Sequence, residues 1–180
     1  MKQTPLIACV ALMAAACGGQ APPTRSAADD APHRACVLED GLRLEIPVPR
    51  GYALATSPQA CVLVNESAND AALLSFASLP ADGNDAAIIL STGDGARRWA
   101  RGSGLLGTGA TDVDEVRETP LFGHTSAAYG LLANPAGLGA SEVLVLRAQR
   151  AGELLLVMVI SPRGDEAHQR ELLELLASVR

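Results

Sequence analysis

The sequence contains few aromatic residues and almost no lysine. Aromatic side chains make up 3% of its 180 residues, and the single lysine is Lys2. Proteins that bind nucleic acid chains commonly stack bases on aromatic rings, and the phosphates of nucleic acids dominate the affinity through basic side chains. The formal net charge here is −6, and it becomes −7 without Lys2. We therefore expect no nucleic-acid partner.

Long hydrophobic runs are also missing. The longest apolar run, Leu6–Ala16, has 11 residues, whereas a helix needs roughly 20 to cross the hydrocarbon core of a bilayer. We therefore expect no membrane-spanning helix in the mature protein.

The first residues have the layout of a secretory signal. Lys2 supplies a positive charge, the run Leu6–Ala16 supplies the apolar region, and Ala14-Ala15-Ala16 supplies small residues before a cleavage point. This pattern predicts a signal peptide over residues 1–16, removed by cleavage of the bond between Ala16 and Cys17.

The sequence Ala14-Ala15-Ala16-Cys17 resembles the lipobox of bacterial lipoproteins, although Ala14 stands where leucine is common. The resemblance implies that Cys17 receives a diacylglyceryl thioether and anchors the chain in a membrane. By analogy with Gram-negative lipoproteins, Gly18 in place of aspartate after the cysteine implies the outer membrane, with the domain facing the periplasm. The alternative is ordinary secretory cleavage of the same bond, which leaves Cys17 unmodified.

Two cysteines then remain for the domain, because Cys9 lies in the signal peptide and Cys17 is the expected anchor. In an oxidising compartment, Cys36 and Cys61 are expected to form a disulfide bond. Closing a loop of this length stabilises a fold by about 3 kcal/mol in the chain-entropy model. The alternative is a reactive or metal-binding cysteine.

The rest of the chain divides into a tether and one domain. Residues 17–35 are rich in Gly, Ala, Pro and charged residues without apolar periodicity, which predicts a disordered tether after the lipidated cysteine. Residues 36–180 suit a single globular domain with one core.

Apolar patterns within the domain predict seven strands and two helical regions. Asp94 is expected to start a central helix if the segment 82–90 does not form one, and Asp165 is expected to cap a final helix with Leu172, Leu175 and Leu176 on one face. The apolar run 155–160 predicts a strand covered on both faces. The expected strands are residues 42–48, 60–65, 71–79, 112–118, 124–132, 142–150 and 154–160.

This order of elements predicts an α+β fold. We expect a largely antiparallel sheet with one central helix region and a C-terminal amphipathic helix packed on it. The opening Gly41–Tyr52, which contains Pro49-Arg50-Gly51-Tyr52, and the ending Ser178-Val179-Arg180 resemble the PsbP-like and DcrB-like α/β/α domains. The resemblance covers residues 38–180 and implies an α/β/α sandwich that acts as a non-enzymatic envelope lipoprotein or accessory module.

Two short motifs have simpler explanations than a ligand site. Residues 102–107 spell G-x-G-x-x-G, but the order of strand and helix around them is the reverse of a dinucleotide-binding site, so we interpret them as a loop. Asp112, Asp114 and Glu115 have the oxygen ligands that hard cations prefer. Since alternate residues of a strand face opposite ways, these three do not converge, and a solvated strand face is the preferred interpretation. We expect no bound metal or cofactor.

Two hypotheses for function follow. The first is a membrane-anchored, non-catalytic envelope lipoprotein that binds a protein or envelope component through the loops at residues 102–109 and 134–139. The second is a small exported hydrolase that uses His124 or His168 with a carboxylate. The sequence has no G-x-S-x-G nucleophile motif. A cleft that holds either histidine within reach of a carboxylate and a serine hydroxyl would favour the hydrolase.

Overall fold

The computed structural model describes residues 30–39, 41–65, 73–78, 93–102, 104, 106–135, 138–151 and 153–180. Its helices are α2 (Gly93–Gly102) and α3 (Glu166–Ala177). Its strands are β1 (His33–Val37), β2 (Arg43–Pro47), β3 (Tyr52–Thr56), β4 (Ala60–Asn65), β5 (Leu73–Ser78), β6 (Thr111–Leu121), β7 (His124–Ala133), β8 (Ser141–Arg150) and β9 (Glu153–Pro162). The expected signal peptide, Cys17, most of the expected tether and the segment 82–90 lie outside the described residues.

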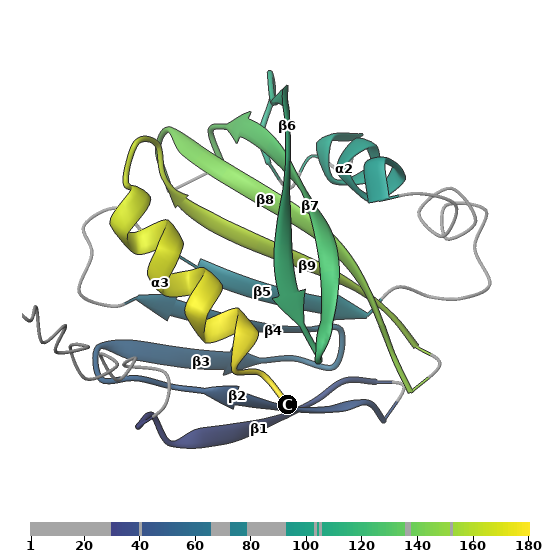
Figure 1. Ribbon diagram of the computed structural model, residues 1–180, viewed down its shortest axis with the longest axis vertical. Coiled ribbons are helices and arrows are strands. Elements are labelled where there is room, and N and C mark those ends of the chain that lie inside the picture. The colour runs from purple at the N-terminus through teal and green to yellow at the C-terminus, as the bar shows by residue number, and fades with distance from the viewer. Residues whose placement is uncertain are drawn as a thin grey trace, which may run out of the picture.

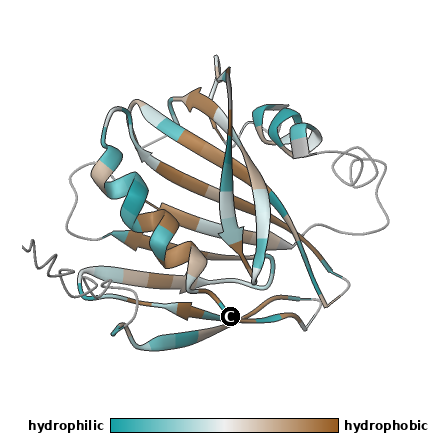
Figure 2. Cartoon of the chain, viewed as in Figure 1, coloured by the Kyte–Doolittle hydropathy of each residue, from teal (hydrophilic) through white to brown (hydrophobic). Residues whose placement is uncertain are grey.

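Seven strands form one antiparallel sheet in the order β3-β4-β5-β9-β8-β7-β6 (Figure 1). The strand β9 lies in the middle, and its residues 154–161 are all buried. Figure 2 shows hydrophobic residues along much of this strand. The prediction that the run 155–160 forms a central strand covered on both faces is confirmed, because alternate residues of β9 enter the two separate hydrophobic cores.

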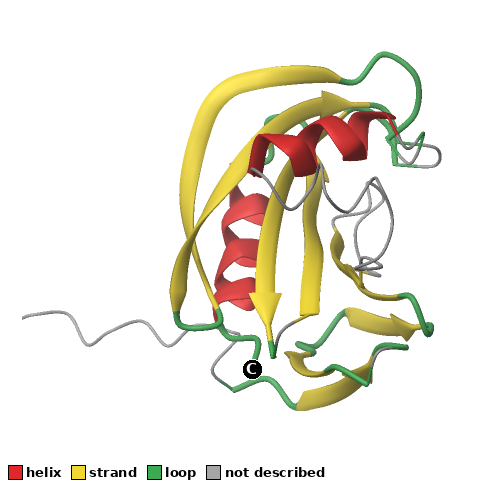
Figure 3. Cartoon of the chain, turned by 90° about the vertical axis from the view of Figure 1, so that its right-hand side faces the viewer, coloured by secondary structure: helices red, strands yellow, loops and turns green. Residues whose placement is uncertain are grey.

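The two helices lie on different sides of the sheet (Figure 3). Helix α3 packs against β9, β6 and β5, and its Leu172, Leu175 and Leu176 belong to the larger core. Its N-cap is Asp165, as expected, and the carboxylate accepts a hydrogen bond from the backbone N–H of His168 at 3.1 Å. The spacing of apolar residues thus predicted both the helix and the face that it buries.

Helix α2 packs against β7 and β8 and is held there by Arg97. The guanidinium of Arg97 pairs with Asp94 at 2.5 Å, donates to the main-chain oxygen of Val113 at 3.0 Å, and lies 5.6 Å from the ring centroid of Tyr129. An arginine with this many partners fixes the position of a short helix that has little apolar surface of its own.

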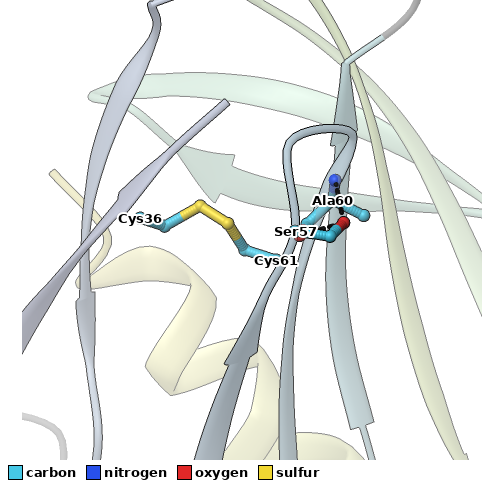
Figure 4. The surroundings of a disulfide bond; sticks show 4 residues. All are labelled: Cys36, Ser57, Ala60 and Cys61. Carbon is cyan, nitrogen blue, oxygen red and sulfur yellow. Dashed lines mark hydrogen bonds between the residues drawn. A yellow bond between two sulfur atoms is a disulfide. The ribbon is translucent and has the colours of Figure 1, made fainter. Parts of the chain in front are cut away.

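A second sheet consists of β1 and β2, which pair antiparallel from His33 with Pro47 to Val37 with Arg43. Arg180 continues this sheet, because its main chain exchanges hydrogen bonds with Glu45 in both directions. The bond between Cys36 in β1 and Cys61 in β4 links the two sheets, with the Cα atoms 6.3 Å apart (Figure 4). Both cysteines are fully buried, which is consistent with the disulfide that the sequence predicts.

The expected α+β class is wrong, because it overestimates the helical part of the fold. The structure is mainly β, because nine strands and only two helices form among the described residues, and α2 covers one part of the sheet instead of forming a central helical layer. Two strands were missed: β1 contains the charged Arg34 and follows Pro32, and β3 has little alternation of apolar and polar residues. The strand β1 also places His33–Ala35 in the fold, although the sequence assigns these residues to the tether.

Within the described ranges, no helix has both the length and the apolar character needed to cross a membrane.

Candidate functional site

A cleft of about 710 Å³ opens at one end of the main sheet, beside the C-terminal residues of α3 and the chain that follows. Four segments distant in the sequence line it: His33 of β1, the β6–β7 turn at residues 122–124, the β8–β9 turn at residues 149–151, and residues 177–180. In Figure 1 the last residue lies close to the β6–β7 turn, next to β1 and β2. The cleft therefore forms where the two sheets and α3 meet.

The charged and titratable side chains that line the cleft are all basic. Arg150 and Arg180 are arginines, and His33 and His124 are histidines that can gain a positive charge. Within the described part of the chain, no aspartate or glutamate lines the cleft. The cleft thus differs from the chain as a whole, whose formal net charge is −6. A local excess of positive charge inside a concave surface attracts anions.

Arg150 is held by an aromatic ring. Its Cζ lies 4.8 Å from the centroid of the Phe122 ring, in a cation–π contact between the two hairpin turns. Stacking occupies one face of the planar guanidinium and leaves the in-plane N–H donors available. Among the described residues, no hydrogen bond or ion pair uses these donors. Arg150 is thus oriented without being neutralised.

Both turns that line the cleft contain a residue in an unfavourable backbone conformation. Phe122 has φ of 51° and Ala151 has φ of 53°, and they are the non-glycine residues with positive φ in the described part of the chain. A side chain with a Cβ atom seldom adopts this region, but each residue is the first of a two-residue hairpin loop, where the favoured turns require positive φ. In Phe122 the conformation places the ring under Arg150.

The histidines do not form the arrangement that a hydrolase needs. His124 lines the cleft and is exposed, whereas His168 lies at the first turn of α3. In the cleft, the Ser178 hydroxyl donates to the main-chain oxygen of Glu174 at 3.1 Å, and His33 Nε2 lies 3.4 Å from the main-chain oxygen of Ser178. Among the described residues, no hydrogen bond joins a histidine ring to a serine hydroxyl.

His168 instead completes the cap of α3. Its Nδ1–H donates to Asp165 Oδ2 at 2.5 Å, while its backbone N–H donates to Oδ1 of the same carboxylate. The hydrogen bond from the His168 side chain, followed by that from its backbone, lowers the pKa of Asp165. The pair stabilises the start of the helix.

The cap makes stability depend on pH. A carboxylate with a lowered folded pKa stabilises the fold above its ordinary pKa, near 4, and this contribution is lost as the pH falls through the lower folded value. We expect the urea midpoint of the wild type to fall more between pH 6 and pH 2 than that of Asp165→Asn, which keeps an acceptor but does not titrate. If the urea midpoints of the two proteins fell equally with pH, this role of Asp165 would be contradicted.

One buried phenol has a shifted pKa but no place in a site. Burial, followed by the carboxylate of Glu171, raises the pKa of Tyr52 to about 12. A phenol that keeps its proton across the physiological range cannot act as a base there. Tyr52 belongs to the core between β3 and α3.

The other sequence candidates take structural roles. Asp112 pairs with Arg101 at 3.1 Å and lies 3.7 Å from Arg97, while the side chains of Asp114 and Glu115 lie outside the described residues. Within the described residues, no group of His, Cys, Asp and Glu side chains could hold a metal ion. The G-x-G-x-x-G segment follows α2 and precedes β6, so the reversed order that the sequence indicates is confirmed.

The two loops expected to bind a partner do lie side by side. A Cβ atom on Gly107 would come within 2.5 Å of the main-chain oxygen of Asn134. They line a smaller pocket of about 280 Å³, with Arg163 as its one ionisable side chain among the described residues. This pocket is at the other end of β9 from the basic cleft, so the sequence identified a real loop cluster but missed the charged site.

Comparison with solved structures places the chain in a known fold. Its structure is similar to the solution structure of cyanobacterial PsbP (CyanoP) from Synechocystis sp. PCC 6803, with a TM-score of 0.54, 17% identity, and coverage of 91% of this chain and 96% of that one. A protein of unknown function from Pseudomonas aeruginosa, described as a putative regulator, matches with a TM-score of 0.44, 15% identity, and coverage of 77% and 88%. No protein-family model matches the chain, and no curated protein matches it in sequence. The sequence-based resemblance to PsbP-like domains is thus supported at the level of the fold.

Proposed function

We propose that this chain is an exported lipoprotein whose domain is a non-catalytic binding module of the cell envelope. In this proposal residues 1–16 are a signal peptide, Cys17 carries the lipid, and the residues up to β1 are the tether. The outer membrane, with the domain facing the periplasm, is the proposed location. The basic cleft is the proposed binding surface.

The observation that carries the binding role is the cleft itself. It gathers Arg150, Arg180, His33 and His124 from four segments, and its serine hydroxyl is hydrogen-bonded to a carbonyl and not to a histidine. Such a site can attract and orient a ligand, but it does not present a nucleophile activated by a base. The PsbP-like fold supports the same interpretation, because the sequence resemblance associates it with accessory modules.

The anchor is tested on the full chain expressed in a Gram-negative host. We expect metabolic labelling with an alkyne-bearing palmitate analogue to mark the protein in the membrane fraction. The variant Cys17→Ala should lose both the label and the membrane association. Recovery of wild-type protein that begins with an unmodified Cys17 in the soluble fraction would show ordinary secretory cleavage and overturn the anchor.

The binding role is tested by site-specific photocrosslinking in intact envelopes. A photoreactive residue at Gln149, which is exposed and lines the cleft, is expected to give discrete adducts. The matched position is Arg163, which is exposed at the other end of β9. Adducts from position 163 alone, or the same adducts from both positions, would overturn the cleft as the binding surface.

A further inference from the structure

The basic cleft has the donors to recognise one particular chemical class. Resting on the proposed function, which makes this cleft the binding surface, we infer that the cleft binds a phosphate group. The source is either a soluble phosphomonoester or the headgroup of an anionic phospholipid. Two guanidinium groups that have no ion-pair or hydrogen-bond partner among the described residues line the cleft, and the cleft lies at the first residue of β1.

The two arginines have unused donors. Arg150 is fixed by the Phe122 ring, and the Arg180 side chain is exposed. Within the described residues, neither guanidinium takes part in a salt bridge or donates a hydrogen bond. Guanidinium groups bind the oxygens of phosphate in pairs, through parallel N–H donors. A phosphate between these two arginines would satisfy donors that the protein leaves open.

The histidines extend the same surface. His124 is exposed at the start of β7, and His33 is half-buried with its Nε2 close to the main-chain oxygen of Ser178. Each adds a ring nitrogen to the cleft that can form a hydrogen bond. Two guanidinium groups and two imidazole rings around one cleft suit a negatively charged group with several oxygens.

Two glutamates near the cleft form no ion pair with its arginines among the described residues. Glu153 lies directly opposite Arg150 in the β8–β9 hairpin, but it does not line the cleft and forms no ion pair with Arg150 in the described part of the chain. The side chain of Glu45 pairs with Arg43 at 2.7 Å. The main-chain oxygen of Arg180 is occupied as well, since it accepts from the backbone N–H of Glu45 at 2.7 Å.

The position of the cleft brings phospholipid within reach. His33 is the first residue of β1, and fifteen residues lie between it and Cys17 in the sequence. In an anchored protein the cleft therefore lies on the side of the domain where the tether enters. A flexible tether of this length spans about 20–25 Å, so the domain can approach the membrane and bring its guanidinium groups within the Debye length of about 8 Å from anionic headgroups.

The test uses the full chain purified from membranes in a maltoside detergent, which carries no phosphate. Isothermal titration calorimetry is performed with inorganic phosphate, glycerol 3-phosphate, dihexanoyl phosphatidylglycerol and citrate. Binding of inorganic phosphate or glycerol 3-phosphate without binding of the phospholipid would identify a soluble source. Binding of the short-chain phospholipid alone would identify a headgroup that is recognised together with its glycerol ester.

The variants give the expected size of the effect. Arg150→Gln and Arg180→Gln should each weaken phosphate binding at least ten-fold, whereas Arg163→Gln should not change it. Phe122→Asn should also weaken binding, while its Asn-Gly pair keeps a turn sequence that hairpins favour. In proton NMR spectra, ligand should shift the imidazole signals of His33 and His124 and leave those of His168 unchanged.

Three outcomes would overturn the inference: no binding of any phosphate probe, binding of citrate alone, or an equal loss in Arg163→Gln and Arg150→Gln. Thermal melting of each variant checks that it is folded, and Arg150→Lys, which keeps the charge, should retain part of the affinity. Failure of the anchor is distinguishable from failure of this site. If the anchor prediction is wrong, Cys17→Ala will not change the fractionation of the protein, yet the phosphate probes will still bind.

Discussion

Replacing Phe76 with alanine is expected to lower the free energy of unfolding by about 3–5 kcal/mol. Phe76 is fully buried in β5, between Cys61 of β4 and Val157 of β9. Removing its ring leaves a cavity at the junction of the three strands, because a packed sheet cannot close around so large a void. Urea denaturation followed by circular dichroism measures the loss.

Val116→Ala is the matched control, because Val116 lies in β6 with 49% of its surface exposed. We expect this substitution to change the unfolding free energy by less than about 1 kcal/mol. If Phe76→Ala cost no more than Val116→Ala, the register that places Phe76 in the core would be wrong.

The double variant Cys36→Ala/Cys61→Ala is expected to lose about 3 kcal/mol of unfolding free energy, since the bridge closes a loop of 25 residues. Each cysteine is fully buried, so the substitution also removes packing between β1 and β4. Urea midpoints of the wild type and the variant, each with and without reductant, measure the effect.

The reductant provides the internal control for the bridge. It should lower the midpoint of the wild type toward that of the double variant, and it should leave the double variant unchanged. A wild-type midpoint that is indifferent to reductant, together with two free thiols in the denatured domain, would show that the cysteines are not bonded.

The sequence predicted the elements that have strong local patterns. The seven expected strands correspond to β2 and β4–β9, and the Asp165 cap and apolar face of α3 are present as expected. Hydrophobic periodicity reports burial directly, so it finds elements that pack one face on a core. It failed for β1 and β3, whose residues alternate weakly and which depend on neighbours distant in the sequence.

The cleft could not be predicted because no local pattern encodes it. His33, Phe122, Arg150 and Arg180 are far apart in the sequence and converge only through the sheet topology. One partial signal existed. His124 was singled out as a candidate, but it was considered apart from Arg150 and Arg180, which line the same cleft.

The same lack of local pattern explains the error in fold class. The sequence shows α2 as a capped segment in the middle of the chain, which favours a helical layer in an α+β sandwich. Among the described elements, α2 packs mainly against β7 and β8, while β1, β2 and Arg180 add strand structure beside the larger core. Counts of helices along a sequence do not show how much of a sheet each helix covers.

The bond between Cys36 and Cys61 has a mechanical consequence for a domain pulled from its N-terminal side. Tension enters at β1, where the antiparallel hydrogen bonds to β2 would break one after another. After His33, Arg34 and Ala35 the force reaches Cys36 and passes through a covalent bond into β4 of the main sheet. Peeling of β1 therefore stops after three residues, and the main sheet carries the remaining load.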